Sequence, residues 1–162
     1  MFLLTGCGSE KRAKPAGLPD LVPCVLTFVQ EGTPIEGASI ILRSSDPSFK
    51  WGVGGSTDAK GEVKLQTNGF YDGAPEGDYV ITVSKIFSTG PPAPDSATLP
   101  KSEEEQNKVY SEIRKKTKQM KVVDPKFEQN ETTPLKVTIT KGKTYQSFDL
   151  GKPVNINIPI ID

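Results

Sequence analysis

Three short stretches decide the fold of this chain. They read EGTPIEGASI (residues 31–40), GSTDAKGEVKLQT (55–67) and PEGDYVITVSK (75–85). Each stretch joins a turn that contains Gly, Pro or Asp to a run in which apolar and polar residues alternate. Alternation with a period of two is typical of a strand with one buried face. The three stretches therefore predict short strands that are joined by tight turns.

The same alternation continues on both sides of these stretches. It predicts that one face of each strand is buried, with Cys24, Leu26 and Phe28 inward on the first strand and Tyr79, Ile81 and Val83 inward on a central one. Short strands separated by turn signals are typical of an all-β, antiparallel β-sandwich. The last run contains Pro159, which lacks an amide donor, so we expect an edge strand there. The predicted strands are 21–30, 37–43, 62–67, 78–86, 135–139, 145–150 and 154–160.

The turns between the strands have their own signature. In the segment Ser56–Gly61, Asp58 is placed to accept backbone amides and Gly61 to adopt a positive φ. Replacement of Gly61 by Val is therefore expected to destabilise the domain. The residues to which we assign structural turn roles are Gly32, Pro34, Gly37, Asp58, Gly61 and Gly77.

Residues 87–133 interrupt the strand pattern and are predicted to form an insertion. Four prolines between residues 87 and 100 predict an irregular segment. Residues 101–121 are the one helical candidate, with Ser102 and Glu105 spaced as a capping box. Acidic residues begin this helix and basic residues end it, which suits the helix dipole. Its apolar residues Val109 and Ile113 are four apart and predict a weak contact with the sandwich.

The order of these motifs resembles the transthyretin-like, carboxypeptidase regulatory-like domain. The resemblance rests on a G-x-P-x-x-G-A turn, a T-D-x-x-G turn and a G-x-Y-x-V strand, and it extends to residues 133–150, which resemble a closing hairpin. It implies a prealbumin-like, Ig-like sandwich from residue 21 to 162. Its motifs specify a fold and say little of function. The residues that carry it are Gly32, Pro34, Gly37, Ala38, Thr57, Asp58, Gly61, Gly77, Tyr79 and Val83.

Leu4-Thr5-Gly6-Cys7 resembles the lipobox of bacterial lipoproteins, in which a lipid is attached to the cysteine. We interpret residues 1–7 as a truncated lipoprotein signal peptide, because no charged n-region precedes them. Residues 8–20 are expected to be a flexible tether. The resemblance implies a bacterial cell-envelope protein with a membrane anchor, on the periplasmic face or the cell surface. A chance tetrapeptide is the alternative. Cys24 is expected to be a buried thiol, and a Cys7–Cys24 disulfide is the other possibility.

Composition excludes several classes of chemistry. The chain has 20 basic residues, 20 acidic residues and no histidine. It therefore has no imidazole for a catalytic triad or a zinc site, and no basic excess of the kind that nucleic-acid binding requires. The two enzymes nearest to the resembled domain, hydroxyisourate hydrolase and zinc carboxypeptidase, depend on histidine. We expect no enzymatic activity, no metal and no cofactor.

Trp51, Phe70 and Tyr71 lie in separate loops that sandwiches often bring to one end. They are either a binding face for carbohydrate or peptide or residues that cap the core. We expect a non-catalytic structural or interaction module whose partner is an envelope polysaccharide or protein. The alternative is a carbohydrate- or peptide-binding module that uses these aromatic side chains.

Overall fold

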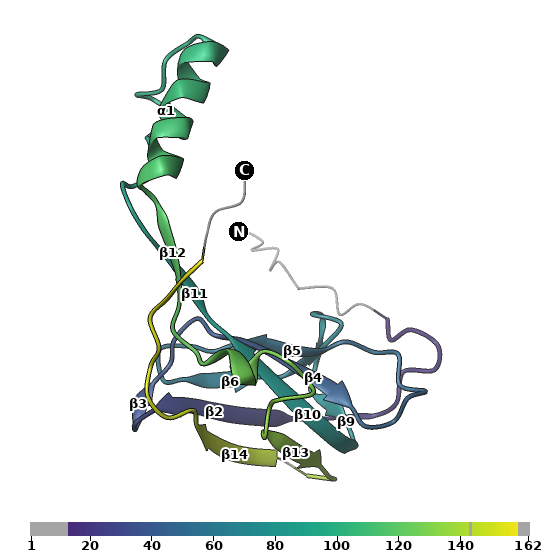
Figure 1. Ribbon diagram of the computed structural model, residues 1–162. Coiled ribbons are helices and arrows are strands. Elements are labelled where there is room, and N and C mark those ends of the chain that lie inside the picture. Colours follow the sequence, from purple (N-terminus) through teal and green to yellow (C-terminus); the bar gives the residue numbers. More distant parts are fainter. Residues whose placement is uncertain (1–12, 143, 159–162) are drawn as a thin grey trace, which may run out of the picture.

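The structure is a computed structural model, and it describes residues 13–142 and 144–158 (Figure 1). Strands dominate it, and the described residues contain one α-helix. The elements are β1 (Leu21–Val22), β2 (Cys24–Gln30), β3 (Thr33–Pro34), β4 (Ser39–Ser44), β5 (Val53–Ser56), β6 (Glu62–Lys64), β7 (Gln66–Thr67), β8 (Tyr71–Asp72), β9 (Ala74–Pro75), β10 (Gly77–Ser84), β11 (Ile86–Thr89), α1 (Glu103–Lys116), β12 (Lys118–Lys121), the 3₁₀ helix η1 (Pro125–Phe127), β13 (Lys136–Ile139), β14 (Thr144–Asp149) and β15 (Ile156–Ile158).

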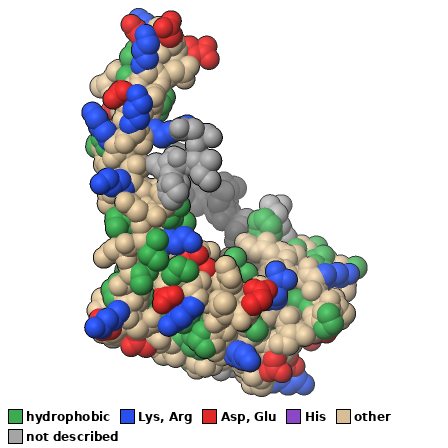
Figure 2. All heavy atoms as spheres, in the orientation of Figure 1, with side chains coloured by type: hydrophobic (Ala, Val, Ile, Leu, Met, Phe, Trp, Pro, Cys, Tyr) green, Lys and Arg blue, Asp and Glu red, His purple; other side chains and the backbone are tan. Residues whose placement is uncertain are grey.

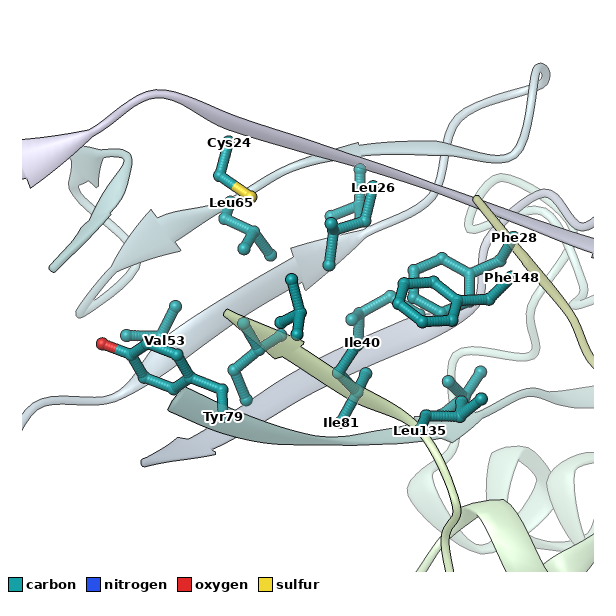
Figure 3. Packing of buried hydrophobic residues seen from close by; sticks show 14 of the residues in the cluster. Cys24, Leu26, Phe28, Ile40, Val53, Leu65, Tyr79, Ile81, Leu135 and Phe148 are labelled. Atoms are coloured by element: carbon teal, nitrogen blue, oxygen red, sulfur yellow. The ribbon is translucent and has the colours of Figure 1, made fainter. Parts of the chain in front are cut away.

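Two sheets pack face to face, as expected for an all-β sandwich (Figure 3). One has the strand order β13-β10-β4-β5-β7-β8, and the other has the order β14-β2-β3, with β6 also paired to β2. The core lies between them and consists of the inward side chains that alternation predicts. On β2 every second residue is buried, and the same holds on β10. The hydrophobic pattern therefore determines which face of each strand is inward.

Aromatic contacts fix the two ends of the core. Phe28 and Phe148 stand opposite each other on β2 and β14, with ring centroids 5.3 Å apart. Such cross-strand pairs stabilise a sheet beyond the area they bury. At the other end, the buried Tyr79 donates its hydroxyl to the carbonyl of Pro75 at 2.9 Å. Its ring meets Phe49 edge-on at 5.7 Å.

The predicted strand 62–67 passes from one sheet to the other. Its first half, β6, pairs with β2, and its second half, β7, pairs with β5. Leu65 lies between the two halves, where its amide donates to Cys24 O at 3.0 Å and its carbonyl accepts from the Gly73 amide at 2.8 Å. The alternation continues through this switch, since Val63, Leu65 and Thr67 are all buried.

The closing segment corrects one sequence prediction. Residues 133–150 do not form a hairpin, because β13 pairs with β10 whereas β14 crosses to the opposite sheet and pairs in parallel with β2. The sandwich is therefore not entirely antiparallel. The crossing gives the backbone of β2 a hydrogen-bonded neighbour besides β3 and β6, and it places Phe148 and Leu150 in the core.

The insertion contains more order than the sequence predicted. β11 follows β10 after one residue and pairs with β12, so residues 87–89, which were predicted to be irregular, belong to a strand. The last strand, β15, pairs with β12 and not with the sandwich. Residues 90–102 and α1 complete this projecting unit, which we call the arm (Figure 1). Residues 122–133 return to the sandwich, where Val123 and Phe127 are buried.

The helix also differs from its prediction. It ends at Lys116, five residues earlier than expected, because β12 takes over the chain at Lys118. Ser102 occupies the N-cap without a side-chain capping bond, and the Gln106 side chain donates to Pro100 O at 2.7 Å. The capping box is therefore absent. None of the helical residues is buried, and α1 points away from the sandwich instead of docking on it (Figure 1).

Candidate functional site

The predicted turn residues form a structural framework. The Oδ1 atom of Asp58 accepts the amides of Glu62 and Lys60, both at 2.9 Å. These two bonds hold the pKa of Asp58 below its ordinary value. Gly61 has φ +73°, and a Cβ there would lie 2.4 Å from Phe28 O. Only glycine fits this place, because the conformation and the close backbone contact both exclude a side chain.

The other predicted turn residues lie where the sheets change direction. Gly32, Gly37 and Gly77 all have positive φ. Pro34 stands opposite Val29 in the short pairing of β3 with β2. These positions shape the backbone and bring no reactive group together, so they form no site.

The aromatic loops, residues 50–52 and 68–71, do come together. The Gly52 amide donates to Asn68 Oδ1 at 3.0 Å, and the Asn68 amide donates to Gly52 O at 2.7 Å. These two hydrogen bonds pair the Trp51 loop with the Phe70–Tyr71 loop. Asn68 and Gly69 both have positive φ, as an Asn-Gly turn allows. Asn68 was not among the predicted site residues, although an Asn-Gly pair is a recognisable turn signal.

The three aromatic side chains differ in exposure. Phe70 is 60% exposed and so does not cap the core, whereas Trp51 is half-buried. Lys50 Nζ lies 5.6 Å from the centre of the Trp51 ring. Tyr71 donates its hydroxyl to Ala13 O at 3.0 Å, which ties this loop to the preceding segment. An aromatic face beside a cation is able to stack on a flat or apolar ligand.

A second surface lies on the arm. An open groove of about 350 Å³ runs along α1. Val109 and Ile113 provide its apolar floor, and Pro91 from the segment before the helix forms one wall. Charged residues line the other side, namely Lys108, Glu112 and Lys116. We call this surface the arm groove.

Charge is divided along the arm. The first turn of α1 holds Glu103, Glu104 and Glu105, and its last turn holds Arg114, Lys115 and Lys116. Figure 2 shows acidic side chains together with basic ones at the far end of the arm, and mainly basic ones nearer the sandwich. This division favours the helix, because each charge lies at the end of the dipole that stabilises it. Two salt bridges within the helix, each 3.0 Å long, join Lys108 to Glu104 and Lys115 to Glu112.

Polar contacts fix the base of the arm to the sandwich. Lys121 Nζ lies 2.5 Å from Glu128 Oε2, and both side chains are mostly buried, at 26% and 17% exposure. The side chain of Gln30 donates to Val122 O at 2.9 Å. The second oxygen of Glu128 is buried without a hydrogen-bond partner, which carries a desolvation cost. The Lys121 ammonium offsets that cost, so this ion pair holds β12 against the sandwich.

The cysteine prediction is confirmed in part. Cys24 is a free, buried cysteine, and burial raises the pKa of its thiol from 9.0 to about 11. Such a thiol is inert at neutral pH. Cys7 and the lipobox lie outside the described residues.

Across residues 13–142 and 144–158, no cluster of His, Cys, Asp and Glu is suited to hold a metal ion. The helix described in this range is too short and too polar to cross a membrane. Comparisons with protein-family models, with curated proteins and with solved structures found no match. The aromatic loops and the arm groove are the two candidate binding surfaces.

Proposed function

We propose that this protein is a non-catalytic interaction module of the bacterial cell envelope. In this proposal a lipid on Cys7 anchors it to a membrane, the sandwich acts as a rigid spacer, and the arm contacts a protein partner. One observation carries the proposal: α1 has no buried residue and projects from the sandwich (Figure 1). A helix in that position adds nothing to the core, so its role lies in what it presents.

The sequence supports the spacer role through its resemblance to transthyretin-like, carboxypeptidase regulatory-like domains. The turn residues that carry this resemblance have the geometry that their motifs require, since Gly61 has a positive φ and Asp58 accepts two backbone amides. The absence of histidine from the chain supports a non-catalytic role. The balanced charge argues against nucleic acid as the partner.

Mass spectrometry of the native membrane fraction tests the anchor. We expect a mature chain that begins at a lipid-modified Cys7, and we expect a Cys7→Ser variant to leave the membrane fraction. An unmodified Cys7 with Met1 retained would refute lipid anchoring and leave the arm to be tested separately.

Photo-cross-linking in cells tests the role of the arm. A photoreactive phenylalanine replaces Tyr110 on the arm, which is 47% exposed, or Tyr145 on the sandwich, which is 66% exposed. The proposal predicts a protein adduct from position 110 and none from position 145. Adducts from position 145 alone, or from neither position, would contradict it.

A second candidate function is carbohydrate or peptide binding by the aromatic loops. The observation in its favour is the hydrogen bonding of Gly52 with Asn68, which brings the Trp51 loop beside the loop of Phe70 and Tyr71. A glycan array with the wild-type protein and with a Trp51→Ala variant tests it. Binding that is lost in the variant supports this function, and no binding by either protein rejects it for glycans.

A further inference from the structure

We propose that the arm binds the arm of a second copy of this chain, with the two α1 helices antiparallel and their grooves facing each other. This inference rests on the proposed function, because it names the partner that the arm contacts. It commits to self-association, and a different protein partner is one of the outcomes that the test distinguishes.

The helix lacks the cover that its apolar residues need. A 14-residue helix is marginal in water without tertiary contacts. Val109 and Ile113 are only partly buried and line an open groove together with Pro91. Two grooves that face each other place these side chains of one copy against those of the other. The free energy of burial then stabilises both helices at once.

Charge decides the direction in which the helices pair. Six of the charged residues of α1 form three pairs of opposite charge at equal distances before and after Tyr110, whereas the counterparts of Glu103 and Arg114 are uncharged. An antiparallel pair centred at this level sets these six residues at the level of opposite charges in the other copy, and a parallel pair sets like charges together. Opposite charges steer and orient association, and like charges oppose it. The matched pairs are Glu104 with Lys116, Glu105 with Lys115 and Lys108 with Glu112.

These charges lie on the same side of α1 as the groove. In a helix, residues three and four apart are neighbours on the surface. Residues 104, 108, 112 and 115 therefore form one row, and residues 105, 109, 112 and 116 form the adjoining row. The groove is lined by Lys108, Glu112 and Lys116 from these rows beside Val109. The apolar floor and the matched charges thus belong to one self-complementary surface, as a twofold interface requires.

The dimensions of the arm permit this pairing. The helix of 14 residues is about 21 Å long. The β11–β12 ribbon beneath it has four residue pairs and adds about 13 Å. When the two antiparallel helices overlap completely, the tip of each arm therefore stays clear of the sandwich of the other copy. One helix face is smaller than the interface of a stable dimer, about 1,200 Å² in total, so we expect a weak dimer with a Kd on the order of 100 μM.

Sedimentation velocity of the full chain between about 10 μM and about 1 mM tests the proposal. A tenfold change in Kd corresponds to about 1.4 kcal/mol of binding free energy. We expect the wild-type protein to dimerise over this range and more weakly at high salt. The variants Glu104→Lys/Glu105→Lys and Lys115→Glu/Lys116→Glu are each expected to lose at least about tenfold in self-association. An equimolar mixture of the two variants is expected to form heterodimers, because each copy then presents one sign of charge to the other.

Cross-linking tests the direction without changing the charge pattern on both copies. A Glu105→Cys variant is mixed with a Lys115→Cys variant, each with Cys7→Ser, and oxidised. The antiparallel pair predicts a disulfide between position 105 of one copy and position 115 of the other, in excess of disulfides between two copies of position 105. Far-UV circular dichroism controls for loss of the helix in the charge variants.

Three results would overturn the proposal. They are a wild-type chain that stays monomeric at about 1 mM, charge variants that retain a folded helix and dimerise as the wild type does, and a predominant disulfide between two copies of position 105. A monomeric chain whose position 110 still cross-links to a different protein in cells would reject self-pairing and retain the proposed function. Failure of both experiments would reject both.

Discussion

At the scale of single residues, Gly61 is the position at which the fold tolerates least change. We predict that Gly61→Ala lowers the free energy of unfolding by about 3 kcal/mol, because a Cβ at φ +73° meets Phe28 O at 2.4 Å and the backbone must move. Urea unfolding of both proteins measures this difference. The loss corresponds to a decrease in Tm of about 10 °C for a domain of this size.

Gly32→Ala is the matched control, because Gly32 has φ +79° and no atom lies within 4 Å of the position of its Cβ. It isolates the cost of the backbone conformation, about 1 kcal/mol. Equal losses at both positions would show that the contact with Phe28 O has no energetic effect.

Two buried groups predict a loss of stability at alkaline pH. Burial raises the pKa of Cys24 from 9.0 to about 11 and that of Tyr79 from 10.0 to about 12. As the pH rises above 9, the unfolded chain loses these protons before the folded protein does, so the free energy of unfolding falls until the folded pKa values are passed. Both groups are neutral in both states at lower pH, where they add no pH dependence.

Unfolding by urea at pH 8 and at pH 11 measures this alkaline loss. The variants Cys24→Ala and Tyr79→Phe are each expected to reduce the difference between the two pH values, although each also lowers stability at pH 8. An unchanged difference in both variants would show that other groups cause the alkaline loss.

At the scale of elements, the arm is separable from the sandwich. We predict that replacing residues 90–117 with Asn-Gly leaves the Tm within about 3 °C of wild type. Thr89 and Lys118 are partners in the β11–β12 pairing, so a two-residue Asn-Gly turn closes the hairpin between them. Thermal unfolding followed by circular dichroism in the strand region measures it. A much larger decrease would mean that α1 supports the core.

The elements also show how far the sequence determines the fold. The inward residues of β2, β4 and β10 follow from alternation alone, because a strand with one buried face leaves a period of two. The partner of β14 does not follow from it, since its alternation is the same whether it pairs with β13 or with β2. Strand pairing depends on contacts between distant residues, such as Phe28 with Phe148, and no local pattern specifies them.

The arm escaped prediction for two reasons. The prolines that begin at Pro91 predicted irregular structure, and that prediction was extended too far back over Phe87–Thr89, whose aromatic and β-branched residues favour a strand. β12 has no such signal in Lys118–Lys121, and it forms because β11 and β15 lie on either side of it.

The loops of Trp51 and Phe70 were predicted to lie at one end of the sandwich. The hydrogen bonds of Asn68 that join these two loops were not predicted.

At the scale of the whole molecule, the chain divides its apolar residues and its charges between two parts. The sandwich buries a core of Leu, Ile, Val and aromatic side chains between its sheets (Figure 3). The arm fully buries none of its helical residues and carries opposite charges at the two ends of that helix. A net charge of zero therefore conceals a strongly polarised arm, which suits association with a surface of matching pattern.

Hydrogen–deuterium exchange of the full chain at low concentration tests this two-part account most directly. Stable core strands exchange only through global unfolding, whereas a helix without tertiary support exchanges through local fraying. We predict that the amides of β2 and β10 exchange slowest, and that those of α1 exchange orders of magnitude faster, within about tenfold of an unfolded peptide. Amides of α1 that exchange as slowly as those of β10 would show that the helix belongs to the folded core, and would contradict the account.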